Sequence, residues 1–356
     1  MIAIHPEVET ALSEGRPVVA LETAVVTHGL PRTPSSKAPR LVEETSKDAE
    51  SARNACWADG RPPAEWRGDR PLNLEVARFI EATVRNQGGT PATVAVIEGT
   101  LHVGLDEAQL ERLADRDDVA KCSTRELGRV MARKESGGTT VAGTLGACQA
   151  ANRELAAAGL PAIEVFATGG IGGVHRNWNQ HGDISADIRA LSETSMAVIS
   201  AGAKVILDLP ATREALDTGM VPVFGWQTGR FPMFTAPGIE DEHPLPRFDD
   251  IEDMAASCRM HWDVLHRGEA VLVANEIPNG LGLDPERLEM LVKRAISEAE
   301  AEGISGAALT PFLLSRLAES TEGDALDANI TLLCSNASVG ARLAAALARQ
   351  RGQTTT

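Results

Sequence analysis

Tyrosine is absent from this chain and aromatic residues make up only 3% of it, so stacking platforms for single-stranded nucleic acid are not expected. Basic residues are also few, with 34 Lys and Arg against 50 Asp and Glu, and the formal net charge is −16. That sign excludes a general nucleic-acid scaffold. Any anionic ligand must therefore be bound by a local cluster of cations.

Paired cysteines are missing as well. The five cysteines are widely separated and none forms a Cys-x-x-Cys pair, which argues against a disulfide or zinc framework. No apolar run reaches 18 residues, and the first residues do not match a secretory signal. We therefore expect a cytoplasmic protein without a membrane partner.

Hydrophobic residues, by contrast, make up 43% of the 356 residues, enough to bury a large core. Short apolar runs alternate with segments of helical periodicity. Asn73 is the predicted cap of the first clear helix, and Gly88 with Gly89 marks its end. The order predicts one α/β/α layered domain over residues 1–356, built around a largely buried mixed sheet. The predicted strands are 18–21, 91–97, 163–168, 197–200, 221–224 and 271–274, and the predicted helices are 72–84, 106–116, 141–158 and 288–299.

One polar segment, 33–70, does not fit this pattern. It is rich in proline and charge, with few sizeable apolar side chains, so it cannot bury much surface by itself. We interpret it as a poorly packed, solvent-exposed insertion. A functional lid and an incorrectly assigned coding sequence are the alternatives.

Two charged residues follow predicted strands, at the edge where open α/β sheets bind ligands. Glu22 ends the run 18–21, and a partly desolvated carboxyl group there can stay protonated and act as a general acid. Lys204 follows the strand 197–200 and precedes the apolar residues 205–207. Such a setting favours a neutral amine, which can form an imine with a sugar aldehyde. The alternatives are a structural hydrogen-bond acceptor for Glu22 and a solvated surface cation for Lys204.

A glycine-rich stretch, 169–173, has spacing that does not match the dinucleotide-binding fingerprint, so nicotinamide or flavin binding is not expected. Asp183, Ser185 and Asp187 come shortly after it. Oxygen ligands of this kind suit Mg²⁺ or Mn²⁺, although such a string is also common at helix caps. Lys121 and the segment 137–140 are candidate phosphate contacts, in patterns that ordinary surfaces share.

Taken together, these segments resemble the pseudouridine-5′-phosphate glycosidase family, also described as indigoidine synthase A-like. Asn329-Ile330 and Asn336-Ala337 extend the match, which covers nearly the whole chain except 33–70. The other matching strings are VVALETAVVTHG (18–29), PATVAVI (91–97), KCS (121–123), GTTVA (138–142), VFATGGIGGVHR (165–176), DISAD (183–187), AGAK (201–204) and TPFLL (310–314).

The resemblance implies reversible cleavage of the C–C glycosidic bond of pseudouridine 5′-phosphate to uracil and ribose 5-phosphate, by a Mn²⁺-dependent homotrimer. It implies that Glu22 is the proton donor, Lys204 the nucleophile and Asp183 the Mn²⁺ ligand. The positions that match substrate-contacting or site-lining residues are Lys121, Val141, Thr168, His175, Ser185, Ala186, Asp187 and Asn329.

Carbon-linked uracil is a poor leaving group, so the two-carboxylate scheme of ordinary glycosidases is insufficient. Our hypothesis is that Glu22 protonates the ribose ring oxygen, the ring opens, and Lys204 bonds to the anomeric carbon to form an imine. A Schiff-base aldolase for another sugar phosphate and an inactive sugar-phosphate-binding homologue are the alternatives. The chain departs from the family pattern at Glu22-Thr23-Ala24, where Glu-Ser-Thr is usual, and at residues 275–278, where Asn-Glu-Ile-Pro replaces Asn-Pro-Ile-Pro.

Overall fold

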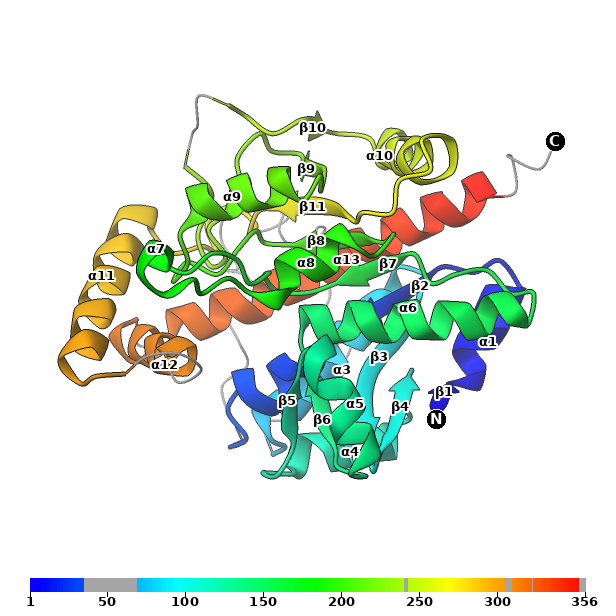
Figure 1. Ribbon diagram of the computed structural model, residues 1–356, viewed down its shortest axis with the longest axis horizontal. Coiled ribbons are helices and arrows are strands. Elements are labelled where there is room, and N and C mark those ends of the chain that lie inside the picture. Colours follow the sequence, from blue (N-terminus) through cyan, green and yellow to red (C-terminus); the bar gives the residue numbers. More distant parts are fainter. Residues whose placement is uncertain (35–68, 240–242, 305–308, 322, 352–356) are drawn as a thin grey trace.

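The structure, a computed structural model, describes residues 1–34, 69–239, 243–304, 309–321 and 323–351. In this part of the chain eleven strands form one sheet, with helices on both of its faces (Figure 1). The strands are β1 (Ile2–Ile4), β2 (Val18–Leu21), β3 (Thr90–Ile97), β4 (Thr100–Val103), β5 (Ala120–Cys122), β6 (Gly137–Thr139), β7 (Val165–Ala167), β8 (Ala197–Ser200), β9 (Val223–Trp226), β10 (Arg247–Phe248) and β11 (Val271–Asn275).

The helices vary from single turns to one very long element. Two of them, η1 (Val25–Gly29) and η2 (Met260–Val264), have π-helical geometry. The α-helices are α1 (Pro6–Ser13), α3 (Leu72–Asn86), α4 (Glu107–Asp115), α5 (Thr124–Ala132), α6 (Val141–Ala157), α7 (Trp178–His181), α8 (Ala186–Ser192), α9 (Leu209–Thr218), α10 (Ile251–Arg259), α11 (Pro285–Ala301), α12 (Leu309–Ser320) and α13 (Asp324–Arg351).

The sheet is mixed, which confirms the predicted fold class. From β3 through β2, β7, β8, β11 and β9 to β10, every neighbouring pair is parallel. These strands therefore end at a common edge, where ligand sites of open α/β sheets form. Antiparallel pairing joins β3 to β4 and to β6, while β1 and β5 extend those two strands in parallel.

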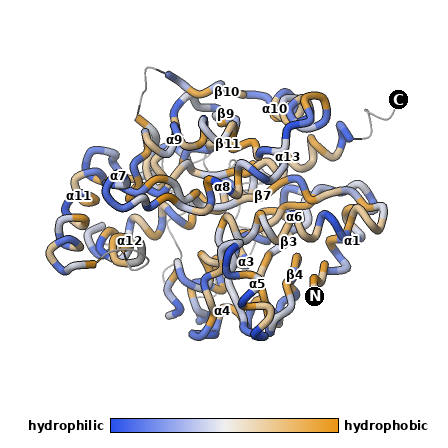
Figure 2. Tube along the Cα trace, in the orientation of Figure 1, coloured by the Kyte–Doolittle hydropathy of each residue, from blue (hydrophilic) through white to orange (hydrophobic). Residues whose placement is uncertain are grey.

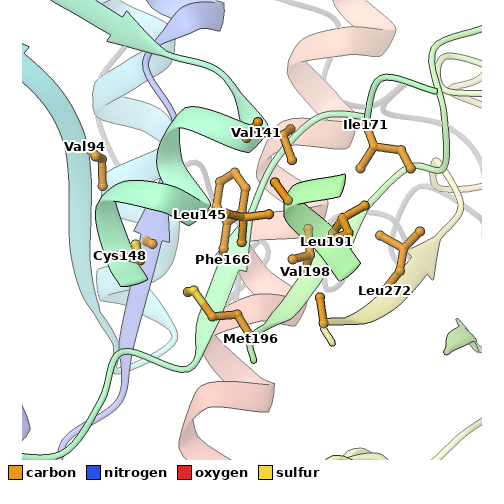
Figure 3. Packing of buried hydrophobic residues seen from close by; sticks show 14 of the residues in the cluster. Val94, Val141, Leu145, Cys148, Phe166, Ile171, Leu191, Met196, Val198 and Leu272 are labelled. Carbon is orange, nitrogen blue, oxygen red and sulfur yellow. The ribbon is translucent and has the colours of Figure 1, made fainter. Parts of the chain in front are cut away.

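Successive residues of the central strands point into two different cores, as expected for a sheet covered on both faces. Phe166 of β7 packs with Leu145 of α6 and Leu191 of α8 in one core (Figure 3). Its neighbours Val165 and Ala167 point into the other core, which α3, α10 and α13 cover. Figure 2 shows the hydrophobic residues concentrated on these inner elements, with hydrophilic stretches toward the periphery.

Helix α13 crosses the second core over 28 residues. Gly340 lets it approach the sheet closely, because an added Cβ would lie 3.3 Å from the Cβ of Ala167. This helix has the length and apolarity to cross a membrane, yet 89% of its most apolar 18-residue window is buried inside the protein. Its composition is therefore explained by its place in the core. The sequence analysis did not predict this helix.

Most predicted elements agree with the structure to within one or two residues. β9 begins two residues later than the predicted strand, and β7 is shorter than 163–168. The cap prediction was wrong: Pro71 precedes α3, and Asn73 is buried inside the helix. The Asn73 amide donates to the carbonyl oxygens of Val26 and Ala114, 2.9 Å away in each case, and so binds α3 to η1 and α4.

The predicted insertion lies mostly outside the described residues. Its described ends are close together, because Pro34 and Pro71 form an isolated antiparallel bridge. The Leu72 N–H also donates to the Thr33 carbonyl at 3.2 Å. The described residues on either side of the segment therefore meet directly before α3.

Candidate active site

The carboxyl group of Glu22 lies at the carboxyl edge of the sheet, beside Thr168. Both residues follow directly after neighbouring parallel strands, since Leu21 of β2 is paired with Ala167 of β7. The Thr168 hydroxyl donates a hydrogen bond to Glu22 Oε1. The register of two strands therefore creates this contact between residues far apart in the sequence.

The environment of Glu22 favours its protonated form. Burial is the largest influence and raises the pKa of the Glu22 carboxyl group above its ordinary value. The groups that modify this pKa further are Lys204, Thr168 and Lys121, which lower it, and Asp187, which raises it. Because burial dominates, Glu22 retains its proton to higher pH than a surface glutamate and can act as a general acid.

The backbone after Glu22 is clamped by Thr23. The Thr23 hydroxyl donates to the Val94 carbonyl at 2.6 Å and accepts from the Thr139 N–H at 3.0 Å. A serine could make both bonds, so this departure from the family pattern conserves the clamp. Ala24, where the family usually has threonine, is buried and presents no hydroxyl.

Lys204 is positioned by a tight turn after β8. Gly202 in this turn has φ +70°, and an added Cβ would lie 2.1 Å from the Pro232 carbonyl oxygen, so only glycine fits. The Lys204 N–H then donates to the Ile171 carbonyl at 3.2 Å. The turn brings the half-buried lysine close enough for its charge to lower the pKa of Glu22.

Lys121 reaches the same cluster from β5, which pairs with β6 through Lys121 and Gly138. Burial lowers the pKa of Lys121, the charge of Lys204 lowers it further, and Glu22 and Asp187 raise it. Two lysines and two carboxyl groups therefore influence one another at this edge. This local group of cations is the kind of cluster that an acidic protein needs to bind an anionic substrate.

Asp187 is buried, and both its oxygens accept backbone hydrogen bonds. Oδ1 accepts from the Ala142 N–H at 2.9 Å and Oδ2 from the Gly172 N–H at 2.8 Å. Asp187 thus joins the start of α6 to the glycine-rich stretch. Ser185 caps α8 by accepting from the Asp187 N–H, and the exposed Ala186 is the first residue of that helix.

Asp183 faces other partners. Its carboxylate is 43% exposed and lies 3.8 Å from Nδ1 of His175, which is 15% exposed. No group of three His, Cys, Asp or Glu side chains is arranged for a metal among the described residues. One half-exposed carboxylate suits a divalent ion that keeps most of its waters, as Mg²⁺-type ions do, and not an ion enclosed by protein ligands.

Val141 and Asn329 complete the predicted set. The Val141 side chain is in the core, so this residue can offer a ligand only its backbone at the start of α6 (Figure 3). Asn329 lies two turns before Asn336 on α13. Its Oδ1 is buried without a hydrogen-bond partner in the described part of the chain, which is a reason to expect it to contact a ligand.

Three polar residues near this edge were given no role by the sequence analysis. Glu276, which stands where the family usually has proline, accepts from the Gly238 N–H at 2.7 Å, the Thr228 hydroxyl at 2.9 Å and Arg230 at 2.8 Å. Asn275 and Asn336 form a second contact group, in which the Asn275 amide donates to the Asn336 side-chain oxygen at 2.9 Å. The sequence signal that could have identified these residues is a polar side chain next to apolar residues. Such a side chain is often buried, and buried polar groups are nearly always hydrogen-bonded.

The fold and this cluster define an α/β enzyme type with a buried carboxyl group and lysines at the carboxyl ends of parallel strands. The chain belongs to the family described as indigoidine synthase A like protein, whose model matches residues 7–59 and 67–346.

Similar proteins cover almost the entire chain. A relative from Herpetosiphon aurantiacus named pseudouridine-5′-phosphate glycosidase is 41% identical over 97% of this chain and 98% of its own length. One of the same name from Paracoccus denitrificans is 40% identical over 98% of this chain and 99% of its own length.

Among solved structures, the prealnumycin C-glycosynthase AlnA in complex with ribulose 5-phosphate has a TM-score of 0.79 and 32% identity, covering 99% of both chains. An indigoidine synthase A-like protein from Thermotoga maritima has a TM-score of 0.75 and 28% identity, covering 98% of this chain and 97% of its own. The whole architecture, and not only the central sheet, is therefore shared.

Proposed function

We propose that this protein reversibly cleaves the C–C glycosidic bond of pseudouridine 5′-phosphate to give uracil and ribose 5-phosphate through an imine on Lys204. The observation that carries the proposal is the convergence of Glu22 and Lys204 at one edge of the sheet, where each is a charge neighbour of the other. The names of the full-length relatives support the substrate.

The first step opens the ribose ring. Glu22 donates its proton to the ring oxygen while the Lys204 nitrogen attacks the anomeric carbon with its lone pair, so the C–O bond breaks as a C–N bond forms. The raised pKa of Glu22 keeps the required proton available. The amine loses its extra proton to the resulting Glu22 carboxylate.

The second step releases the base. The lone pair of the Lys204 nitrogen forms the C=N bond, the electrons of the glycosidic bond move to C5 of uracil, and that carbon takes the proton that Glu22 regained in the first step. Water then hydrolyses the imine, which restores the amine and liberates ribose 5-phosphate. The imine thus allows uracil to leave from a carbon–carbon bond without a carboxylate nucleophile.

Binding of the anionic substrate is assigned to Lys121 and to the backbone of Val141, the first residue of α6. The next two N–H groups of this helix already donate to Asp187 and Thr140. Asp183, with His175 beside it, would hold a divalent ion such as Mn²⁺. When bound, that ion supplies positive charge that offsets the charge of the substrate.

Two assays test this function. Uracil release from pseudouridine 5′-phosphate should be measurable, and should fall when EDTA removes Mn²⁺. Borohydride reduction in the presence of ribose 5-phosphate should leave a pentose adduct on Lys204, detectable by peptide mass spectrometry. Full turnover with unmodified Lys204 would overturn the imine, and absence of uracil would overturn the substrate assignment.

A second candidate is carbon–carbon bond formation with a different acceptor or sugar phosphate. The similarity to a C-glycosynthase bound to ribulose 5-phosphate favours it. A Schiff-base aldolase would trap on Lys204 with other sugar phosphates, and an inactive homologue would bind ribose 5-phosphate without trapping. A panel of sugar phosphates, with and without uracil, separates these possibilities.

We also expect a cytoplasmic homotrimer. The trimer is an expectation from the family resemblance, and light scattering on a purified sample measures it directly. The location is supported by the described cysteines, Cys122, Cys148, Cys258 and Cys334, which are free and buried. Burial raises the pKa of the Cys122 thiol to about 11, so this thiol is unreactive despite its position next to Lys121.

A further inference from the structure

Asn336 is a fully buried amide in the middle of α13, with none of its surface exposed to solvent. Its amide nitrogen donates to the Thr168 carbonyl at 2.7 Å and to the Gly169 carbonyl at 3.3 Å. Its oxygen accepts from the Asn275 amide at 2.9 Å. A buried amide satisfied on both sides in this way has one well-defined orientation.

These contacts form a continuous line to the candidate acid. Asn275, at the end of β11, orients Asn336, and Asn336 binds the peptide that follows β7. The side chain of that same residue, Thr168, donates to Glu22. Asn336 of α13 thus binds the backbone of Thr168, while the Thr168 hydroxyl donates to Glu22.

We propose that Asn336 is a positioning residue for Glu22, acting through Thr168. The inference rests on the proposed role of Glu22 as the proton donor. Asn336 does not touch the substrate in this scheme. It fixes the peptide plane of Thr168, and with it the direction from which the Thr168 hydroxyl meets the carboxyl group.

The sign of the expected effect follows from the charges around Glu22. The facing groups are Lys204, Asp187 and Lys121, and the hydrogen bond from Thr168 lowers the pKa of Glu22 alongside the two lysines. Weakening that bond leaves the charged groups in place and raises the pKa of Glu22 further. Because an acid acts in its protonated form, the alkaline limb of the kcat profile should move to higher pH.

The experiment compares pH profiles of uracil release for the wild type and for Asn336→Leu, which keeps the branching of the side chain but has no hydrogen-bonding groups. We expect kcat at the optimum to fall about tenfold, with KM within about threefold and the alkaline limb displaced upward. Asn336→Ala serves as a second variant in case the leucine prevents folding. Ser335→Ala is the matched control, since Ser335 also accepts from Asn275, at 3.0 Å, on the same helix.

Coupling with Thr168 separates positioning from a merely structural role. If Asn336 acts through Thr168, the double variant with Thr168→Val should lose no more activity than Thr168→Val alone. Thr168→Ser, which keeps the hydroxyl, should restore both the rate and the pH profile. Additive losses, an unmoved alkaline limb, or the same shift in Ser335→Ala would overturn the inference.

Glu22→Gln distinguishes a failure of the role proposed for Asn336 from a failure of the role proposed for Glu22. If this variant is inactive while the Asn336 variants keep the wild-type profile, the inference alone fails. If Glu22→Gln keeps full turnover, the catalytic role of Glu22 fails and the inference fails with it.

Discussion

Two carboxyl groups, one at each end of strand β7, have opposite environments. At the amino end, Glu164 is paired with Arg259 through two bonds of 2.7 and 2.8 Å, and Arg351 adds a third. At the carboxyl end, Glu22 receives a hydroxyl and has its cations only as neighbours. The first arrangement stabilises a charge, and the second keeps a proton available.

This contrast explains why one half-buried glutamate is a candidate for chemistry and the other is not. A carboxylate in direct contact with two arginines is committed to its ion pairs, and removing one partner leaves a buried charge uncompensated. A carboxyl group whose burial is only partly offset keeps its proton to a higher pH than a surface glutamate and can still donate it. The same strand thus contributes stability at one edge and reactivity at the other.

The sharpest test of the comparison is Glu22→Gln. We expect kcat for uracil release to fall roughly 10³-fold, because general acid catalysis is lost, while the unfolding temperature stays the same or rises. Kinetics and thermal unfolding on one preparation provide both numbers. A large loss of stability would show that Glu22 is an anchoring group like Glu164.

The same variant also tests how the stability of the protein depends on pH. The folded-state pKa of Glu22 is raised by burial, so the stability linked to its proton is complete below the ordinary glutamate pKa and is lost as the pH rises through the raised value. Urea unfolding of the wild type should therefore show a decrease in stability over that window. Glu22→Gln should lack this part of the decrease.

Glu164→Gln should have the opposite profile. We expect it to lower the free energy of unfolding by about 3 kcal/mol, because Arg259 is only 8% exposed and would lose its main counter-charge. The kcat of the folded fraction should remain within about twofold of the wild type. Glu14→Gln, which breaks the exposed pair with Arg16, is the control and should cost less than about 1 kcal/mol.

A smaller effect is expected from Glu276→Ala, which removes the anchor of the segment 228–238. That segment supports the Lys204 turn, because Phe234 N–H donates to the Ala201 carbonyl at 2.9 Å and Met233 bridges to Gly202. Borohydride trapping of Lys204 should slow about tenfold, with the pH profile set by Glu22 unchanged. Glu286→Ala, at an exposed position on α11, is the control, and equal trapping rates in both variants would argue against this support.

Thr23→Ser should have the smallest effect. Serine keeps the hydroxyl that bonds to Val94 and Thr139 and loses only a buried methyl group, so we expect a change of about 1 kcal/mol in stability and less than about twofold in kcat. A larger loss of activity would mean that the methyl group shapes the site itself.

The sequence predicted the positions of the strand-end residues well because a short apolar run followed by a polar residue is a local signal. It placed Glu22 after β2 and Lys204 after β8, and both were found at the carboxyl edge. The apposition of Glu22 and Thr168 needed more, since it depends on which strands are neighbours. No spacing along the chain contains that information.

The remaining features arise from long-range packing. The bond between Asn275 and Asn336 joins residues 61 positions apart, and it exists only because α13 crosses the ends of β7 and β11. The different surroundings of Asp183 and Asp187 could not be read from the sequence for the same reason. Although the two carboxylates are close in sequence, the two backbone N–H groups that Asp187 binds come from elsewhere in the fold.

The contacts between residues 31–34 and 71–73, directly before α3, have a consequence for how the segment between them can vary. Pro34 bridges to Pro71, and the Asn73 N–H donates to the Pro31 carbonyl at 3.0 Å, so residues 31–34 and 71–73 are joined directly to each other. Loop-closure entropy grows only slowly with length, so chains of very different size can be exchanged there without moving β2 or α3. Peptides or a reporter domain grafted at this point should therefore leave the described fold intact.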